Sequence, residues 1–369
     1  MSRTFNAWKK QYDSENLEPF SYDMEGLLWL KIKSIARKDI LSEFIELNNI
    51  ALNSTTLSKQ FEELYNILSQ DINRSHQILD DYIIKKHKKI ITNLNQDQLV
   101  SELYKLKVFE WGGDYQNSLD KYLVSHYVKA ISSYDVLLSK FDTEINRAVQ
   151  GYVLNSWYNH WSSILIEHVF KSHKSVLPTV GQVKSVDFFI NNIPFDLKVT
   201  YFPTEFLKQK RKEKGLPVEL TYLKSKAREL RIPFNNTSSP SDIYYEITEK
   251  LKDRRNENSL NVLEELKKSN LEIVNEAISN PKILAKWLYE NQGKMRFGSE
   301  NRLFLVLIDT DDFASSWKLK RNIDLLSPTI SSFLDEFSKK KTDDLKIEFT
   351  YPGKTKVFKT LADIIFIKK

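Results

Sequence analysis

The sequence predicts an α/β fold: a central mixed β-sheet flanked by helices, with a helical N-terminal domain and a helical insertion. Three observations lead to this prediction. Apolar side chains recur at intervals near 3.6 residues from the start of the chain to about residue 140. A hairpin pattern covers residues 186–200, and an almost wholly apolar run covers 302–309. With 369 residues the chain exceeds one ordinary core of about 100–200 residues, so two domains, or a core with a large insertion, are expected.

The predicted domains divide at residue 140. Residues 1–140 are expected to form the helical N-terminal domain, and residues 141–369 the domain that holds the sheet. A helix is expected over 143–173, directly before the first strands. The helical period returns after the hairpin, so an insertion of helices is predicted at about 203–300.

The strands follow from short β-rich runs. Residues 176–180 and the two arms of the hairpin come first. The run 302–309 is typical of a central strand that is buried on both faces. The chain ends with strand-like runs at 345–350, 356–359 and 363–367.

Composition limits the possible chemistry. The chain has no cysteine, which excludes disulfides, thiolate zinc sites, iron–sulfur clusters and cysteine nucleophiles. Any metal would be held by oxygen or imidazole. The formal charge of +6 suits a polyanionic partner, although many proteins with such a charge bind none. The first residues lack the apolar stretch of a signal peptide, so the cytoplasm is the expected compartment.

The hairpin brings two carboxylates together. A tight turn is expected at Asn191-Asn192, because both asparagines tolerate positive φ. With the turn centred there, paired residues have numbers that add to 383. Asp187 then lies opposite Asp196. Since side chains alternate along a strand, Lys198 shares the face of Asp196.

Two facing carboxylates repel each other, so something must offset the charge. Mg²⁺ prefers one or two carboxylates together with waters and phosphate oxygens. Such a site suits phosphodiester hydrolysis: the metal activates water, and Lys198 orients that water or stabilises the charge on phosphorus. The competing interpretation is a solvated hairpin face with an ordinary salt bridge.

The spacing of Asp187, eight intervening residues and then Asp196-Leu197-Lys198 resembles the PD-(D/E)xK motif of the restriction-endonuclease-like superfamily. The resemblance covers about residues 143–202. It implies a restriction-endonuclease-like core in which Asp187 and Asp196 bind a divalent metal and Lys198 takes part in catalysis. Val186 stands where the family name has proline, a position that often varies in the family.

The family also commonly places a glutamate on the preceding helix, which implies a catalytic and metal-binding role for Glu167. The residues themselves leave two alternatives open, because Glu167 belongs to a polar stripe with i, i+4 spacing (Asn155, Asn159, Ser163, Glu167, Lys171). Such a stripe faces either water or a wet active site.

Basic side chains near the motif are candidates for contacts with a phosphate backbone. They are Lys208, Lys210, Arg211 and Lys212 after the hairpin, and Lys318, Lys320 and Arg321 after the apolar run. The alternative is a solvated basic surface.

The sequence thus predicts a Mg²⁺-dependent endonuclease for double-stranded DNA, in a restriction or other defence setting. A homodimer is expected, because cutting both strands takes two sites. Two alternatives remain: a protein that binds nucleic acid without cleaving it, and a nuclease for RNA or for structured or single-stranded DNA.

Overall fold

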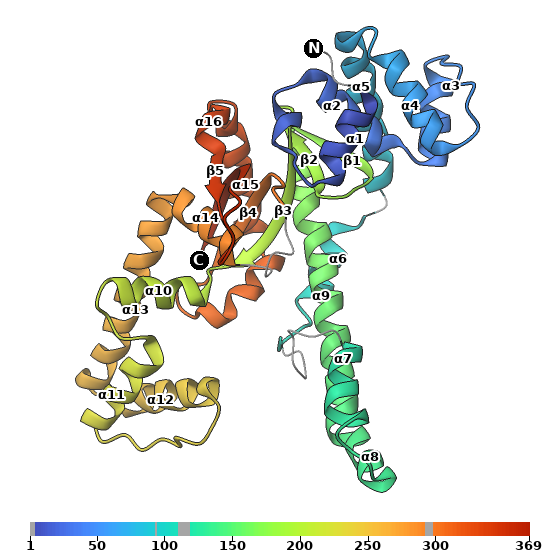
Figure 1. Ribbon diagram of the computed structural model, residues 1–369. Helices are drawn as coiled ribbons and strands as arrows, with labels where there is room; N and C mark the ends of the chain where they lie inside the picture. Colours follow the sequence, from blue (N-terminus) through green and yellow to red (C-terminus); the bar gives the residue numbers. More distant parts are fainter. Residues whose placement is uncertain (1–3, 93, 110–118, 292–297) are drawn as a thin grey trace.

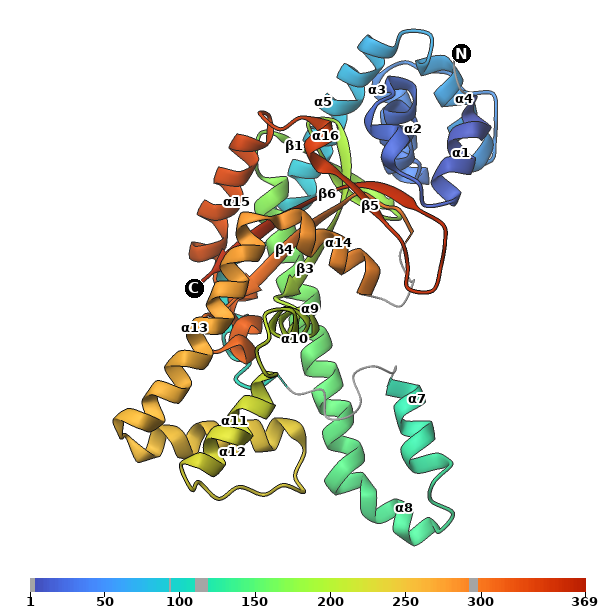
Figure 2. The same cartoon turned by 60° about the vertical axis from the view of Figure 1, so that its left-hand side comes forward.

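The computed structural model describes residues 4–92, 94–109, 119–291 and 298–369 (Figures 1 and 2). A six-stranded mixed sheet forms its centre, in the order β1-β2-β3-β4-β6-β5. The strands are β1 (Val176–Val183), β2 (Val186–Ile190), β3 (Ile193–Tyr201), β4 (Arg302–Ile308), β5 (Lys346–Phe349) and β6 (Phe358–Lys368). The predicted α/β class and the mixed sheet are therefore confirmed.

Strand β4 is the predicted central strand. It lies between β3 and β6, parallel to both, and all seven of its residues are buried. The other pairs in the sheet are antiparallel. One prediction was wrong in detail: the runs 356–359 and 363–367 are not separate, because β6 continues through Thr360 and Leu361 and pairs with β5 on one side and β4 on the other.

Helices account for most of the rest of the chain. Before the sheet lie α1 (Phe5–Asp13), the 3₁₀-helix η1 (Glu18–Ser21), α2 (Met24–Ile35), α3 (Lys38–Leu47), α4 (Leu57–Leu68), α5 (Ile72–Ile91), α6 (Gln96–Leu103), α7 (Leu119–Leu123), the π-helical turn η2 (Val124–Val128), α8 (Tyr134–Lys140), the π-helical turn η3 (Phe141–Ile145) and α9 (Asn146–Lys171). Between β3 and β4 lie α10 (Thr204–Glu213), α11 (Glu219–Glu229), α12 (Pro240–Arg254), α13 (Glu257–Ser279) and α14 (Pro281–Asn291). The 3₁₀-helix η4 (Phe313–Arg321), α15 (Ile323–Phe337) and α16 (Thr342–Leu345) precede β5. None of the described helices is both long and apolar enough to cross a membrane.

The two faces of the sheet are covered by different helices. On one face, Phe188, Phe195 and Leu305 pack against α9 and α15. On the other, Phe304 and Val306 pack against α13 and α14, the last helices before β4. The alternation of side chains along each strand separates these two apolar layers.

The N-terminal helices pack directly on the first hairpin of the sheet. Val183, Val186 and Phe189 belong to the same buried cluster as Trp29 of α2 and Leu79 of α5. Helices α1–α5 therefore share one buried cluster with β1 and β2. The domain boundary predicted at residue 140 stays a prediction.

The turn of the β2–β3 hairpin has the predicted form. Asn191 and Asn192 have φ values of 48° and 65°, and the pairs Phe188↔Phe195 and Ile190↔Ile193 follow the predicted register. Positive φ at both central residues is the geometry of a type I′ turn.

We expect the free energy of unfolding to respond to this geometry. Asn192→Val should lower it by about 1–2 kcal/mol, because a β-branched side chain is strained in the left-handed region. Asn192→Gly should leave it within about 0.5 kcal/mol of the parent, since glycine is favoured at this position. Urea unfolding of both variants measures the difference, and equal stabilities would contradict the assigned turn.

Candidate functional site

Asp187 lies where the β2–β3 ladder ends. The last pair of the ladder is Phe188↔Phe195. Asp187 and Asp196 are the next residues along β2 and β3 and lie just beyond that pair. Its Oδ2 accepts a hydrogen bond from the backbone N–H of Leu197, at 2.8 Å. The carboxylate of Asp187 is therefore fixed against β3 at the residue between Asp196 and Lys198.

Lys198 and Asp196 share one face of β3, as the alternation predicts. Lys198 Nζ donates to Asp196 Oδ1 at 2.9 Å. Leu197, between them, points into the apolar layer of α9 and α15. Asp196 is buried, whereas the side chain of Lys198 is 41% exposed, so the ammonium group is accessible to solvent.

The surroundings of Asp187 disfavour its charged form. Burial, followed by the negative charges of Asp196 and Glu167, raises the pKa of Asp187 to about 6. The hydrogen bond from Leu197 and the charge of Lys171 act in the opposite direction. Three carboxylates thus influence one another here, and a cation near Asp187 would relieve the repulsion.

Sequence reasoning missed Arg302. Its Nε lies 3.3 Å from Asp196 Oδ2, and its Nη2 lies 3.1 Å from Glu300 Oε2. The guanidinium is almost wholly buried and lies over the ring of Tyr289. An arginine at the start of an apolar strand was the available signal, but its partner depends on the parallel register Asp196↔Arg302.

Glu167 is near these residues but belongs to a different ion pair. It lies on α9 and accepts from Lys171 Nζ at 2.7 Å. Among the described residues, no three His, Cys, Asp or Glu side chains are arranged to hold a metal ion. The metal-binding roles of Asp187, Asp196 and Glu167 therefore stay predictions, and in the structure Glu167 acts on Asp187 through its charge.

The remaining donors fit Mg²⁺. Both aspartates offer hard oxygen ligands, and the raised pKa of Asp187 indicates negative charge that the protein leaves partly uncompensated. Mg²⁺ commonly binds one or two carboxylates and completes its shell with water and phosphate oxygens. Arg302 is a competing counter-ion for Asp196, so Asp187 is the stronger of the two candidate ligands.

The polar stripe on α9 is not a simple solvated face. Asn155 is buried, and Asn159 accepts from Lys320 Nζ at 2.8 Å. Further along the helix, Glu167 and Lys171 pair beside Asp187. The stripe therefore runs from η4 toward the two aspartates and packs partly against other elements of the fold, while its predicted place in an active site stays a prediction.

Four of the predicted phosphate-binding residues are accessible. Lys208 and Lys210 lie on α10 and pair with Glu205 and Glu213, one turn away. Lys212 and Lys318 are exposed. Helix α10 starts three residues after β3 ends, so its basic side chains follow Lys198 closely along the chain.

The other three predicted contacts are buried, and we withdraw them. Arg211 is 2% exposed and donates to Pro217 O, Ser269 Oγ and Asn270 Oδ1, so it joins α10 to α13. Arg321 donates to the carbonyls of Leu103 and Leu106. Lys320 is also buried, which lowers its pKa to about 8. Sequence alone could not separate these cations from solvated ones.

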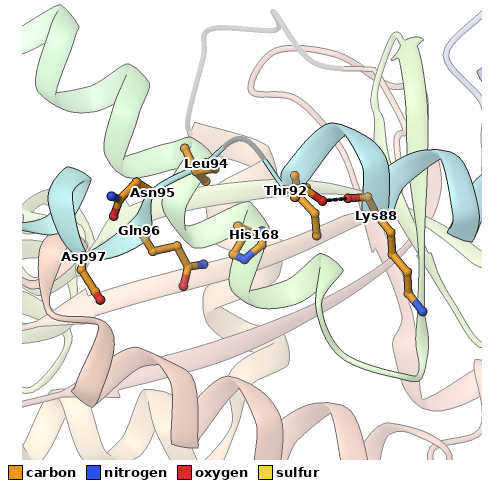
Figure 3. Close-up of a pocket in the computed structure, with 8 residues that line it drawn as sticks. Lys88, Thr92, Leu94, Asn95, Gln96, Asp97 and His168 are labelled. Carbon is orange, nitrogen blue, oxygen red and sulfur yellow. Dashed lines mark hydrogen bonds between the residues drawn. The ribbon is translucent and has the colours of Figure 1, made fainter.

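A hollow of about 560 Å³ lies between α9 and the segment that joins α5 to α6 (Figure 3). His168 points toward it, together with Thr92, Asn95 and Gln96 from the end of α5 and the start of α6. His87, also on α5, lies near Lys171 and His168. Burial lowers the pKa of His87, and the charges of Lys171 and His168 lower it as well, to about 4. The imidazole of His87 is therefore neutral at physiological pH.

Comparisons with protein-family models, with curated proteins and with solved structures found no match. The resemblance to the PD-(D/E)xK superfamily therefore stays a prediction. Any functional assignment rests on the geometry of the chain's own residues.

Proposed function

We propose that the protein is a Mg²⁺-dependent endonuclease that hydrolyses phosphodiester bonds of double-stranded DNA, with a restriction or other defence role. The observation that carries this proposal is the position of Asp187. It is tied to the backbone of Leu197, it is surrounded by negative charge, and it lies beside the Asp196–Lys198 pair. A partly buried carboxylate of raised pKa beside a partly exposed lysine is typical of functional sites.

The proposal assigns each side chain a role that fits its chemistry. Asp187 and Asp196 would hold Mg²⁺, which makes water nucleophilic near neutral pH and neutralises charge on the scissile phosphate. Lys198, the exposed member of its ion pair with Asp196, would donate a hydrogen bond to a phosphate oxygen. Lys208, Lys210, Lys212 and Lys318 would contribute sequence-independent contacts to the DNA backbone.

One observation favours a non-catalytic alternative. Arg302 and Lys198 both pair with Asp196, so this carboxylate has counter-ions within the protein. A protein that binds nucleic acid without cleaving it could keep the pair as part of its scaffold. Titration with Mg²⁺ by calorimetry separates the two proposals, because only the nuclease requires a Mg²⁺ site that is lost with Asp187.

The role of Lys198 has its own test. Lys198→Ala is expected to slow Mg²⁺-dependent cleavage of plasmid DNA by about 100-fold, the usual effect of removing one donor to a developing oxyanion. Lys198→Arg should restore part of the rate, since it keeps a charged donor. The rates come from time courses with Mg²⁺, and a parallel reaction with EDTA gives the background.

Lys359→Ala is the matched control, because Lys359 is an exposed strand lysine that also pairs with a carboxylate, Glu348. Its cleavage rate should equal that of the parent protein. If Lys198→Ala cuts as fast as this control, Lys198 has no catalytic role. A panel of double-stranded, single-stranded and branched DNA and of RNA then decides the substrate.

A further inference from the structure

Residues 119–155 form a helical arm that extends away from the sheet (Figures 1 and 2). The arm contains α7, η2, α8, η3 and the first part of α9. Helices α7 and α8 have five and seven residues, and neither has a buried residue. Helix α8 runs without a break through η3 into α9, so α7 and the outer end of this long helix bury no side chain within the single chain.

Large apolar side chains are exposed along this arm. Among the described residues, nine of the twenty-two exposed large hydrophobic side chains lie between 124 and 154. Tyr134, Leu138 and Phe141 are spaced i, i+4 and i+7 and are 72%, 47% and 43% exposed. A helix of a soluble protein normally buries a stripe with this spacing.

The exposed area is large enough for a stable interface. Nine side chains of these types at these exposures present roughly 900 Å², about the area that each partner contributes to a standard interface. This area is a total for the arm rather than one contiguous patch, because consecutive residues such as Tyr152, Val153 and Leu154 point to different sides of a helix. The arm therefore has the surface of a protein that binds another protein.

The charges of the arm indicate which partner. Its acidic and basic side chains are equal in number: Asp120, Asp135, Asp142 and Glu144 against Lys121, Lys129, Lys140 and Arg147. A phosphate backbone would attract a surplus of basic residues, which the arm lacks. An identical, neutral arm meets it without net repulsion.

We propose that the arm is a dimerisation element that packs against the arm of a second copy of this chain. A two-fold axis brings the same patch of both copies together, so the Tyr134–Leu138–Phe141 stripe would meet its own counterpart. The resulting assembly of helices buries the surface that α7 and α8 leave exposed in one chain. The proposal does not depend on the nuclease assignment, because it is tested without DNA or metal.

The first experiment measures mass against concentration by sedimentation equilibrium of the full chain. The parent protein should be a dimer at micromolar concentration, and Leu138→Glu combined with Phe141→Glu should raise the dimer dissociation constant about 100-fold or more. The control is Leu47→Glu, because Leu47 is 65% exposed outside the arm. A monomeric parent, a dimeric double variant or a monomeric control would each overturn the proposal.

The second experiment does not depend on whether the charged double variant folds. It uses cross-linking through a single new cysteine, which is possible because the chain has none. Leu138→Cys introduces the only thiol, and a short bifunctional maleimide can then join only two copies of residue 138. We expect cross-linked dimers from this variant and none from Leu47→Cys. The same low yield from both variants would show that the arms do not meet.

Discussion

The Asp187→Asn protein is expected to lose Mg²⁺-dependent cleavage by about 10³-fold or more and to unfold at a higher denaturant concentration than the parent. Activity falls because a metal contributes several kcal/mol to the transition state and Asp187 is its stronger candidate ligand. Asparagine keeps an oxygen that can accept the hydrogen bond from Leu197 N–H. The substitution therefore removes charge while keeping the local geometry.

The gain in stability follows from the direction of the pKa shift. The pKa of Asp187 is raised from 3.8 to about 6 in the folded protein, so the folded state binds the proton more tightly than the unfolded state. Stability then falls as pH rises from about 4 to 6, and above pH 6 the ionised carboxylate costs on the order of 3 kcal/mol. Asp187→Asn removes this cost at pH 7.5 and none of it at pH 3.5.

Urea unfolding at pH 7.5 and at pH 3.5 measures the gain in stability. Urea unfolding at pH 7.5 with and without Mg²⁺ measures the binding of the metal. Mg²⁺ should stabilise the parent, because a ligand that binds only the folded state shifts unfolding by mass action, and it should leave Asp187→Asn unchanged. Asp343→Asn is the control, since Asp343 is an exposed aspartate on α16. An Asp187→Asn protein that cleaves normally, or that responds to Mg²⁺ as the parent does, would refute the metal site.

Removing Arg302 is expected to produce the largest loss of stability. Arg302→Leu should lower the free energy of unfolding by about 3–5 kcal/mol, because it leaves Asp196 and Glu300 buried without their shared cation. The loss should shrink in Arg302→Leu combined with Glu300→Gln, because the second substitution removes the charge of Glu300, whereas Asp196 keeps Lys198 as a partner. Equilibrium denaturation of both variants at pH 7.5 gives the comparison.

Arg254→Leu serves as the reference for losing an arginine. The guanidinium of Arg254 donates to the carbonyls of Leu230 and Arg231 but is exposed, so its loss should cost no more than about 1 kcal/mol. Equal losses for Arg254→Leu and Arg302→Leu would mean that the buried ion pairs contribute little. The Arg302 result also bears on function, since it measures how strongly the protein itself neutralises Asp196.

The sequence by itself determined the local features of the candidate site. Two asparagines that accept positive φ define the turn, and the turn sets the β2–β3 register. The alternation of a strand then places Lys198 on the face of Asp196. The unbroken apolar run also identified β4 as a central strand, because only a strand covered on both faces lacks polar alternation.

Only the tertiary structure decided which charges meet across the fold. The approach of Arg302 to Asp196 comes from the pairing of two strands about a hundred residues apart, and local patterns do not encode that register. Arg211 and Lys212 are neighbours in sequence, yet one is buried against α13 and the other is exposed. The stripe on α8 and η3 has the spacing of a buried helix face. Its exposure appears only when the packing of the whole chain is known, because burial depends on what the rest of the fold brings to that face.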